Sequence, residues 1–266
     1  MTDSRRWWHL VMMLVAALAV AAVMVAQEPA AQAAPKKQAP TVKEPESGIL
    51  FPTWMDVPGA ARHQLLGLGC REKTILYVNV YGMGMYAEAK GLGKKLKAHA
   101  QALEFKKAHK DAKLVELLLS GEFEISMRWV FCRDVEGEDV REAFEDWLAP
   151  RRKKEVAKIE DAAARRAEDA ASLKAMNAFR DLFSMDIEKG DELIFLWAPG
   201  GELTTWLNGE EIGKIVNETV ARAMWDCYVG KDAAEPGAKK KFLQGAWRLA
   251  RRYTPAAEEK AEAKTP

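Results

Sequence analysis

The residue with the clearest chemical potential in this sequence is Arg71, which follows an apolar stretch punctuated by glycines at residues 65–70. A guanidinium beside a core must be paired or must face a ligand, because an unpaired buried charge is strongly unfavourable. Its donor fork fits a carboxylate or an enolate-like oxygen. Tyr81 has the strand parity to share a sheet face with Arg71, and its hydroxyl can donate to the same oxygen. The two residues therefore predict an anion-binding site.

The separation of these two residues in the sequence limits how they can meet. Ten residues of one straight strand span roughly 33 Å, so the chain must fold back between Arg71 and Tyr81. A symmetric hairpin would centre on Leu76, which has no turn chemistry, and the preferred turn is Glu72-Lys73-Thr74. Two residues of the same parity are therefore alternatives to Tyr81, namely Tyr77 and Asn79.

Both members of the predicted site also have structural explanations. Arg71 can form a salt bridge to Glu72, Glu88 or another carboxylate at the sheet edge. Tyr81 can be a core aromatic residue whose hydroxyl reaches the rim. The sequence leaves these alternatives open.

An apolar ligand would also need apolar walls, and each buried CH2 of an acyl chain contributes about 0.8 kcal/mol. Met83 and Met85 follow Tyr81 closely, and methionine side chains adapt well to such a chain. Ordinary core packing explains the same methionines. We include both as candidate ligand-binding residues.

Motifs of other chemistries are missing from the sequence. The chain has no GxSxG, HExxH or Walker motif, and no GxGxxG that opens a helix. Its 3 cysteines and 4 histidines are scattered, so we predict no metal site, no cofactor and no disulfide framework. Lys+Arg is 40 and Asp+Glu is 39, and a net charge of +1 argues against nucleic acid as a partner.

The ends of the chain differ from its middle. Arg5 and Arg6 precede a charge-free apolar run over residues 10–26, and a small-x-small site follows at residues 31–33. This pattern predicts a signal peptide over residues 1–33, or a retained anchor that would associate with a membrane, and thus an exported, periplasmic or envelope protein. Residues 34–48 are predicted to be a disordered tether and residues 254–266 a disordered tail. One domain is predicted over residues 49–253.

The periodicity of this domain changes from two to 3.6 several times. Alternation predicts strands at residues 65–71, 74–81, 123–129, 193–197 and 203–207. Helical spacing is found at residues 92–118, 138–148, 216–228 and 238–251. Pro150 is predicted to stop the second of these segments, residues 138–148, and residues 151–173 are predicted to form a charged, solvated helix. This order favours an α+β fold, an antiparallel sheet covered on one face by a layer of helices.

Three blocks of the sequence, taken together, resemble the chalcone isomerase-like family. A G-x-G-x-R strand at residues 67–71 is followed by a tyrosine-containing strand at residues 80–88. A Gly-Asp hairpin with its glycine turns covers residues 189–209, and a helix that ends in glycine covers residues 212–230. The chain is most similar to the exported bacterial proteins of this family. The resemblance implies the family's open-faced sandwich of one sheet and one helix layer.

The resemblance also implies two known chemistries. Chalcone isomerases close a chalcone phenoxide onto an enone with an arginine, a threonine and a Tyr/Asn pair. Fatty-acid-binding members hold an acyl carboxylate with an arginine and a tyrosine. The arginine falls on Arg71 and the Thr-or-Tyr position on Tyr81, whereas the places of the Tyr/Asn pair hold Val135 and Glu142.

Three functions follow as expectations. The first is an exported protein that binds a small apolar anion, such as a fatty acid or a phenolic compound, with Arg71 on the acid group. The second is an intramolecular lyase or isomerase of the chalcone isomerase type that uses Arg71 on an unknown substrate. The third is an envelope protein whose charged segment, residues 151–173, contacts a protein partner.

Overall fold

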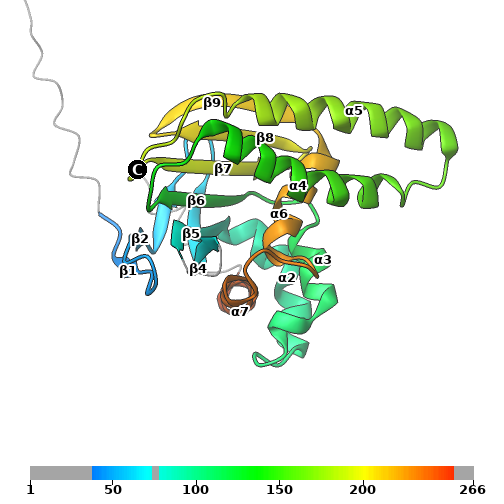
Figure 1. Cartoon of the computed structure of the whole chain (residues 1–266). Coiled ribbons are helices and arrows are strands. Elements are labelled where there is room, and N and C mark those ends of the chain that lie inside the picture. Colours follow the sequence, from blue (N-terminus) through cyan, green and yellow to red (C-terminus); the bar gives the residue numbers. More distant parts are fainter. Residues whose placement is uncertain (1–37, 74–77, 255–266) are drawn as a thin grey trace, which may run out of the picture. The chain divides into compact units, whose positions relative to one another are not determined.

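A seven-stranded antiparallel sheet organises the protein, and its strands follow one another in the sheet in the order of the sequence. The computed structural model describes residues 38–73 and 78–254. Because each strand pairs with its neighbour in sequence, the helices enter as insertions between strands or follow the last one (Figure 1). The strands are β3 (Trp54–Asp56), β4 (Arg62–Lys73), β5 (Val78–Glu88), β6 (Ile125–Phe131), β7 (Glu192–Ala198), β8 (Glu202–Leu207) and β9 (Glu210–Val216).

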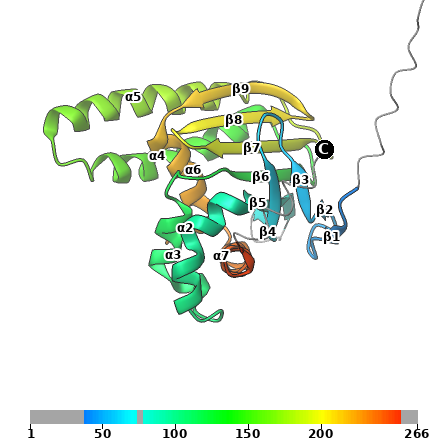
Figure 2. The same ribbon diagram turned by 180° about the vertical axis from the view of Figure 1, so that it is seen from behind.

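The helices gather on one face of this sheet, and the main hydrophobic core lies between the two layers. The view from behind shows the opposite face, with β3 and the start of β4 in front of the other strands (Figure 2). This arrangement confirms the predicted α+β fold with one helix layer. The helices are α2 (Ala89–Ala102), α3 (Ala112–Leu118), α4 (Gly137–Val156), α5 (Ala162–Asp181), α6 (Glu218–Val229) and α7 (Pro236–Arg252), with a short 3-10 turn, η1 (Ala108–Lys110), before α3.

The local patterns of the sequence explain most of these elements. Along β6, the apolar side chains Ile125, Met127, Trp129 and Phe131 alternate toward the core, as the period of two predicted. The hairpins from β7 to β9 turn where glycines adopt positive φ, at Gly200 and Gly201 and again at Gly209. The predicted strands and turns of this region are therefore confirmed.

The predicted stop at Pro150 is wrong. Helix α4 continues through Pro150 as far as Val156, and α5 is a separate helix that begins at Ala162. Pro150 lies on the exposed side of α4, where a carbonyl that loses its helical donor can be hydrated. The charged segment, residues 151–173, thus comprises the end of α4 and the first part of α5. Its use as a partner surface stays a prediction.

The predicted disordered tether is wrong for its second half. Strand β1 (Thr41–Lys43) pairs with β2 (Leu50–Pro52), and the compact unit begins at Ala39 rather than at residue 49. The wholly buried Glu44 side chain accepts hydrogen bonds from the backbone and hydroxyl of Ser47. The tether-like composition did not indicate this pairing, because a three-residue strand carries too little pattern to recognise.

The predicted turn at Glu72-Lys73-Thr74 is also wrong. Strand β4 includes Lys73, and the connection to β5 lies within residues 74–77, which are outside the described residues. Arg71 pairs directly across the hairpin with Tyr81, and a register shift follows between Arg71 and Glu72. The hairpin is therefore nearly symmetric about Arg71 and Tyr81, although the residues midway between them do not favour a turn.

Several predictions fall on residues that are not described. The signal peptide or anchor over residues 1–33 and the tail from residue 255 onward lie outside the described ranges, so export remains a prediction. No helix within the described residues is long and apolar enough to span a membrane.

On the sheet face away from the helices, a buried polar group links two strands. The His63 ring, on β4, contacts the Ser126 hydroxyl of β6 at 2.7 Å through Nδ1 and the Glu124 carboxylate at 3.2 Å through Nε2. Burial lowers the pKa of His63 and thereby favours the neutral ring. A neutral ring satisfies both partners when it donates to Glu124 and accepts from Ser126.

Candidate functional site

A cavity of about 280 Å3 lies between α4 and strands β4, β5 and β6. Its buried floor is apolar and mostly aromatic, and it consists of Tyr81, Trp129, Phe131, Val140 and Phe144. Its exposed lining residues carry charge instead, and they are Arg133, Asp139, Glu142 and Asp146. Concave sites with apolar walls and a few polar groups are the usual form of a small-molecule site. This cavity is therefore the candidate functional site.

Arg71 contributes the half-buried cation of the cavity lining. Its side chain is 26% exposed, and Nη1 donates to Glu235 Oε1 at 2.8 Å. The guanidinium also lies over the ring of Trp147, with Cζ 4.8 Å from the ring centroid. Neither Glu72 nor Glu88 takes the place of Glu235 in this ion pair. Arg71 thus combines a carboxylate partner from α7, an aromatic platform from α4 and access to the cavity.

Tyr81 lies on the same sheet face as Arg71 and is almost completely buried. Its ring stacks on Trp129 with centroids 4.2 Å apart, and its hydroxyl lies 3.2 Å from the hydroxyl of Tyr228 on α6. Burial raises the pKa of both tyrosines, and the charge of Arg71 opposes that rise at both. Both hydroxyls therefore stay protonated near the guanidinium. Since their mutual hydrogen bond uses one proton, the other remains available to donate.

The other predicted ligand-binding residues lie elsewhere. Asn79 donates through Nδ2 to the Glu46 carbonyl at 3.0 Å. Met83 and Met85 are fully buried in the main core and are not among the described residues that line the cavity. Tyr77 lies outside the described residues. Of the candidate residues that are described, the structure brings Arg71 and Tyr81 to the cavity.

The α4 wall of the cavity was missed as part of a site. The helical spacing had already indicated that Val140, Phe144 and Trp147 share a face, but it did not indicate what that face covers. Val135 and Glu142 also line the cavity. Neither Tyr228 nor Glu235 carried a sequence signal, because their partners are more than a hundred residues away.

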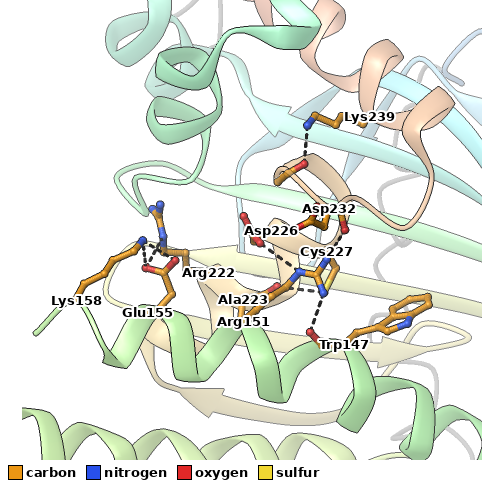
Figure 3. Close-up of polar contacts among 11 residues, drawn as sticks. Trp147, Arg151, Glu155, Lys158, Arg222, Ala223, Asp226, Cys227, Asp232 and Lys239 are labelled. Atoms are coloured by element: carbon orange, nitrogen blue, oxygen red, sulfur yellow. Dashed lines mark hydrogen bonds and ion pairs between the residues drawn. The ribbon is translucent and has the colours of Figure 1, made fainter.

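A polar network fixes α4 against α6 and the segment that leads to α7 (Figure 3). Arg151 on α4 donates to Asp226 at 3.2 Å, to its own helix at the Trp147 carbonyl at 3.0 Å, and to the Asp232 carbonyl. Lys239 on α7 donates to the Gly230 carbonyl at 2.6 Å. These bonds hold Trp147 and the chain around Glu235 in place on either side of Arg71.

The three cysteines are unpaired thiols, two of them buried and one partly buried. Cys70, Cys132 and Cys227 are free, and burial raises the pKa of Cys70 and of Cys227 to about 12. Cys70, Glu44 and Glu46 offer ligand atoms within 4.8 Å of one another.

Comparisons with known proteins agree with this architecture. The family model described as chalcone isomerase like matches residues 61–243, which is more than half of the chain. Fatty-acid-binding protein 1 of Arabidopsis thaliana is 24% identical over 216 residues, covering 79% of this chain and 72% of the relative. The crystal structure of an Arabidopsis thaliana fatty-acid binding protein superimposes with a TM-score of 0.65 at 22% identity, covering 79% of this chain and 99% of that one.

The structural likeness concerns the fold, and the family match includes the strands and helices that build the cavity, from β4 to the first half of α7. The chain therefore belongs to the chalcone isomerase-like family.

Proposed function

We propose that the protein binds a medium-chain fatty acid in the cavity, with the carboxylate on Arg71 and the acyl chain against the aromatic floor. The observation that carries this proposal is that Arg71 lines the same cavity as the buried rings of Tyr81, Trp129 and Phe131. The name of the similar Arabidopsis protein, which is matched both in sequence and by its crystal structure, supports fatty acids as the ligand class.

The polar end of the cavity can hold a carboxylate in two ways. A guanidinium has five N–H donors, and Glu235 accepts one hydrogen bond from Arg71, so further donors can serve a ligand. The proton left over from the Tyr81–Tyr228 pair supplies another donor close to the same charge. Charge-assisted hydrogen bonds of this kind are stronger than neutral ones.

The cavity volume limits the length of the acyl chain. A cavity of about 280 Å3 lies at the lower end of small-molecule sites, which run from about 300 to 1,000 Å3. Such a volume suits an acid of about the length of decanoate better than a long-chain acid. Longer acids would leave part of their chain outside the cavity, which is why the proposal names medium-chain acids.

Titration of the purified protein with decanoate tests the proposal. Trp129 and Trp147 line the cavity, so their fluorescence reports its occupancy. Arg71→Ala removes a charge-assisted contact to the carboxylate. It should therefore bind decanoate at least about tenfold more weakly than the wild type. Arg166→Ala is the matched control, since Arg166 is an exposed arginine that does not line the cavity, and it should change affinity by less than about threefold. Absent binding by the wild type, or equal affinity in Arg71→Ala, would contradict the proposal.

An intramolecular lyase is the second candidate function. Its supporting observation is that Arg71 and the exposed carboxylate Glu142 line one cavity, so that a cation and a base could act on the same substrate. Absorbance measurements of chalcone cyclisation test it with the wild type, Arg71→Ala and Glu142→Gln. A rate above the uncatalysed reaction that both variants lose would support the lyase, whereas no such rate in the wild type would end it for chalcones.

A further inference from the structure

We propose that Glu235 and the ligand carboxylate are alternative partners of Arg71, so that Glu235 acts as a built-in competitor and sets the affinity for anions. This inference rests on the proposed function, because it concerns the same cavity and the same arginine. The inference makes Glu235 a specificity-determining residue. Glu235 directly precedes α7 and is not among the residues that line the cavity.

The contact between Arg71 and Glu235 is suited to exchange. It consists of one hydrogen bond, from Nη1 to Oε1 at 2.8 Å, between side chains that are 26% and 21% exposed. Partial exposure weakens an ion pair, because water screens it and solvates the separated charges. A ligand carboxylate that reaches the Arg71 guanidinium from the cavity can therefore displace Glu235 from it.

The Glu235 carboxylate also has a second interaction available, with the N-terminal end of α7. It is the N-cap residue of α7, yet its side chain makes no capping hydrogen bond while it reaches to Arg71. The first backbone N–H groups of a helix lack intrahelical partners, and the helix dipole favours a negative charge there. A carboxylate released from Arg71 stays beside this helix end, which offsets part of the cost of its displacement.

The backbone around Glu235 is held firmly, so the exchange requires only rotation of a side chain. The Ala234 N–H donates to the Cys227 carbonyl at 2.8 Å. Lys239 and Arg151 bind carbonyls of the same connecting segment, at Gly230 and Asp232 (Figure 3). The segment between α6 and α7 can therefore keep its path while the Glu235 carboxylate leaves Arg71.

A competitor of this kind has an effect whose sign is specific. Removing its charge weakens its hydrogen bond to Arg71 and makes the site more positive, so anionic ligands should bind more tightly. A neutral ligand of equal length should not respond. If Glu235 instead served to orient Arg71, the same substitution would weaken anion binding.

The test is titration of the full chain with decanoate and with decanol, for the wild type, Glu235→Gln and Asp232→Asn. Glu235→Gln should bind decanoate roughly tenfold more tightly, the size of one charge-assisted hydrogen bond. Its affinity for decanol should change by less than about twofold. Asp232→Asn removes one negative charge from the same exposed segment without touching Arg71, and it should shift decanoate affinity by less than about twofold.

The outcomes separate this inference from the proposed function. If the wild type binds decanoate and Glu235→Gln binds it equally or more weakly, the competitor role is wrong and the fatty-acid proposal stands. If neither binds decanoate, both are wrong. Binding that occurs only in Glu235→Gln would contradict the proposed function of the wild type, while it would show that Glu235 keeps anions from Arg71. Circular dichroism checks that the variant is folded, and Glu235→Ala, which must also bind more tightly, decides the matter if Glu235→Gln does not fold.

Discussion

Phe144 on α4 lies between two aromatic regions that differ in how completely they are filled. On one side its ring contacts Phe179, Phe183 and Phe195, at centroid distances of 4.9, 4.9 and 6.3 Å. On the other side it stacks toward Trp129 at 6.0 Å and forms part of the cavity floor. The same helix and the same sheet thus enclose a packed core in one place and a cavity in the other.

The difference follows from what the helix layer supplies. Over the packed region, α5 adds Phe179 next to α4, and Phe183 follows just beyond its end; interiors filled in this way reach the density of organic crystals. Over the cavity, the wall opposite the strands is α4 alone. Trp129, which is 3% exposed, has an indole Nε1 without a hydrogen-bond partner among the described residues. The core is therefore filled on the α5 side, whereas open space remains on the side of β4 and β5.

The largest effect should come from emptying the packed region. Phe179→Ala removes a fully buried ring, and we expect the free energy of unfolding to fall by about 3–5 kcal/mol. Decanoate affinity of the folded variant should change by less than about threefold, because Phe179 does not line the cavity. Denaturant unfolding and fluorescence titration measure the two quantities. A loss of stability below about 1 kcal/mol would mean that this region is not the packed core described here.

Filling the cavity should have the opposite pattern. Ala143 lines the cavity from α4, and Ala143→Phe places a ring where a ligand chain would lie. Decanoate should bind at least about tenfold more weakly, while the unfolding free energy changes by less than about 1 kcal/mol, since the ring enters existing space instead of overpacking a filled core. Ala143→Ser, which adds little volume, is the matched control and should bind like the wild type. Unchanged decanoate binding in Ala143→Phe would place the ligand elsewhere.

The smallest expected effect is the change in affinity for each carbon added to the acyl chain of the ligand. Each CH2 buried contributes about 0.8 kcal/mol, so affinity should rise about fourfold for each added carbon until the cavity is full. We expect the rise to level off near decanoate in the wild type and at shorter acids in Ala143→Phe. Isothermal titration of a series of straight-chain acids measures this. An affinity that does not depend on length, or that climbs steadily to octadecanoate, would contradict a cavity of this size.

Much of the fold could be predicted because many of its elements have a recognisable pattern of residues within a short stretch of sequence. The alternation along β6, the glycine turns between β7 and β9 and the apolar stripe of α6 each lie within a few residues. The failures occurred where tertiary context overrides a local rule. Pro150 is tolerated inside α4 because it lies on an exposed side, and β1 is a strand only because β2 pairs with it.

The sequence pointed to two residues of the candidate site, whereas their partners came only from the structure. A charged arginine after an apolar strand, and a tyrosine of the same parity, were sufficient to single out Arg71 and Tyr81. Their direct pairing was not foreseen, because the strands continue past the residues that favour a turn. The partners Tyr228 and Glu235 belong to helices far along the chain, and no spacing rule connects them to the first hairpin.

The sequence by itself determined which side chains are available: one arginine at the end of an apolar strand, aromatic residues on alternating positions, and helices with one apolar face. Only the tertiary structure decided which of them meet. It placed α4 over β5 and β6 so that a cavity remains, and it brought the start of α7 to Arg71. The physical reason is that residue type and periodicity are local properties. The neighbours of a charge are instead set by how distant elements pack, and that packing decides whether the arginine binds a ligand or a glutamate.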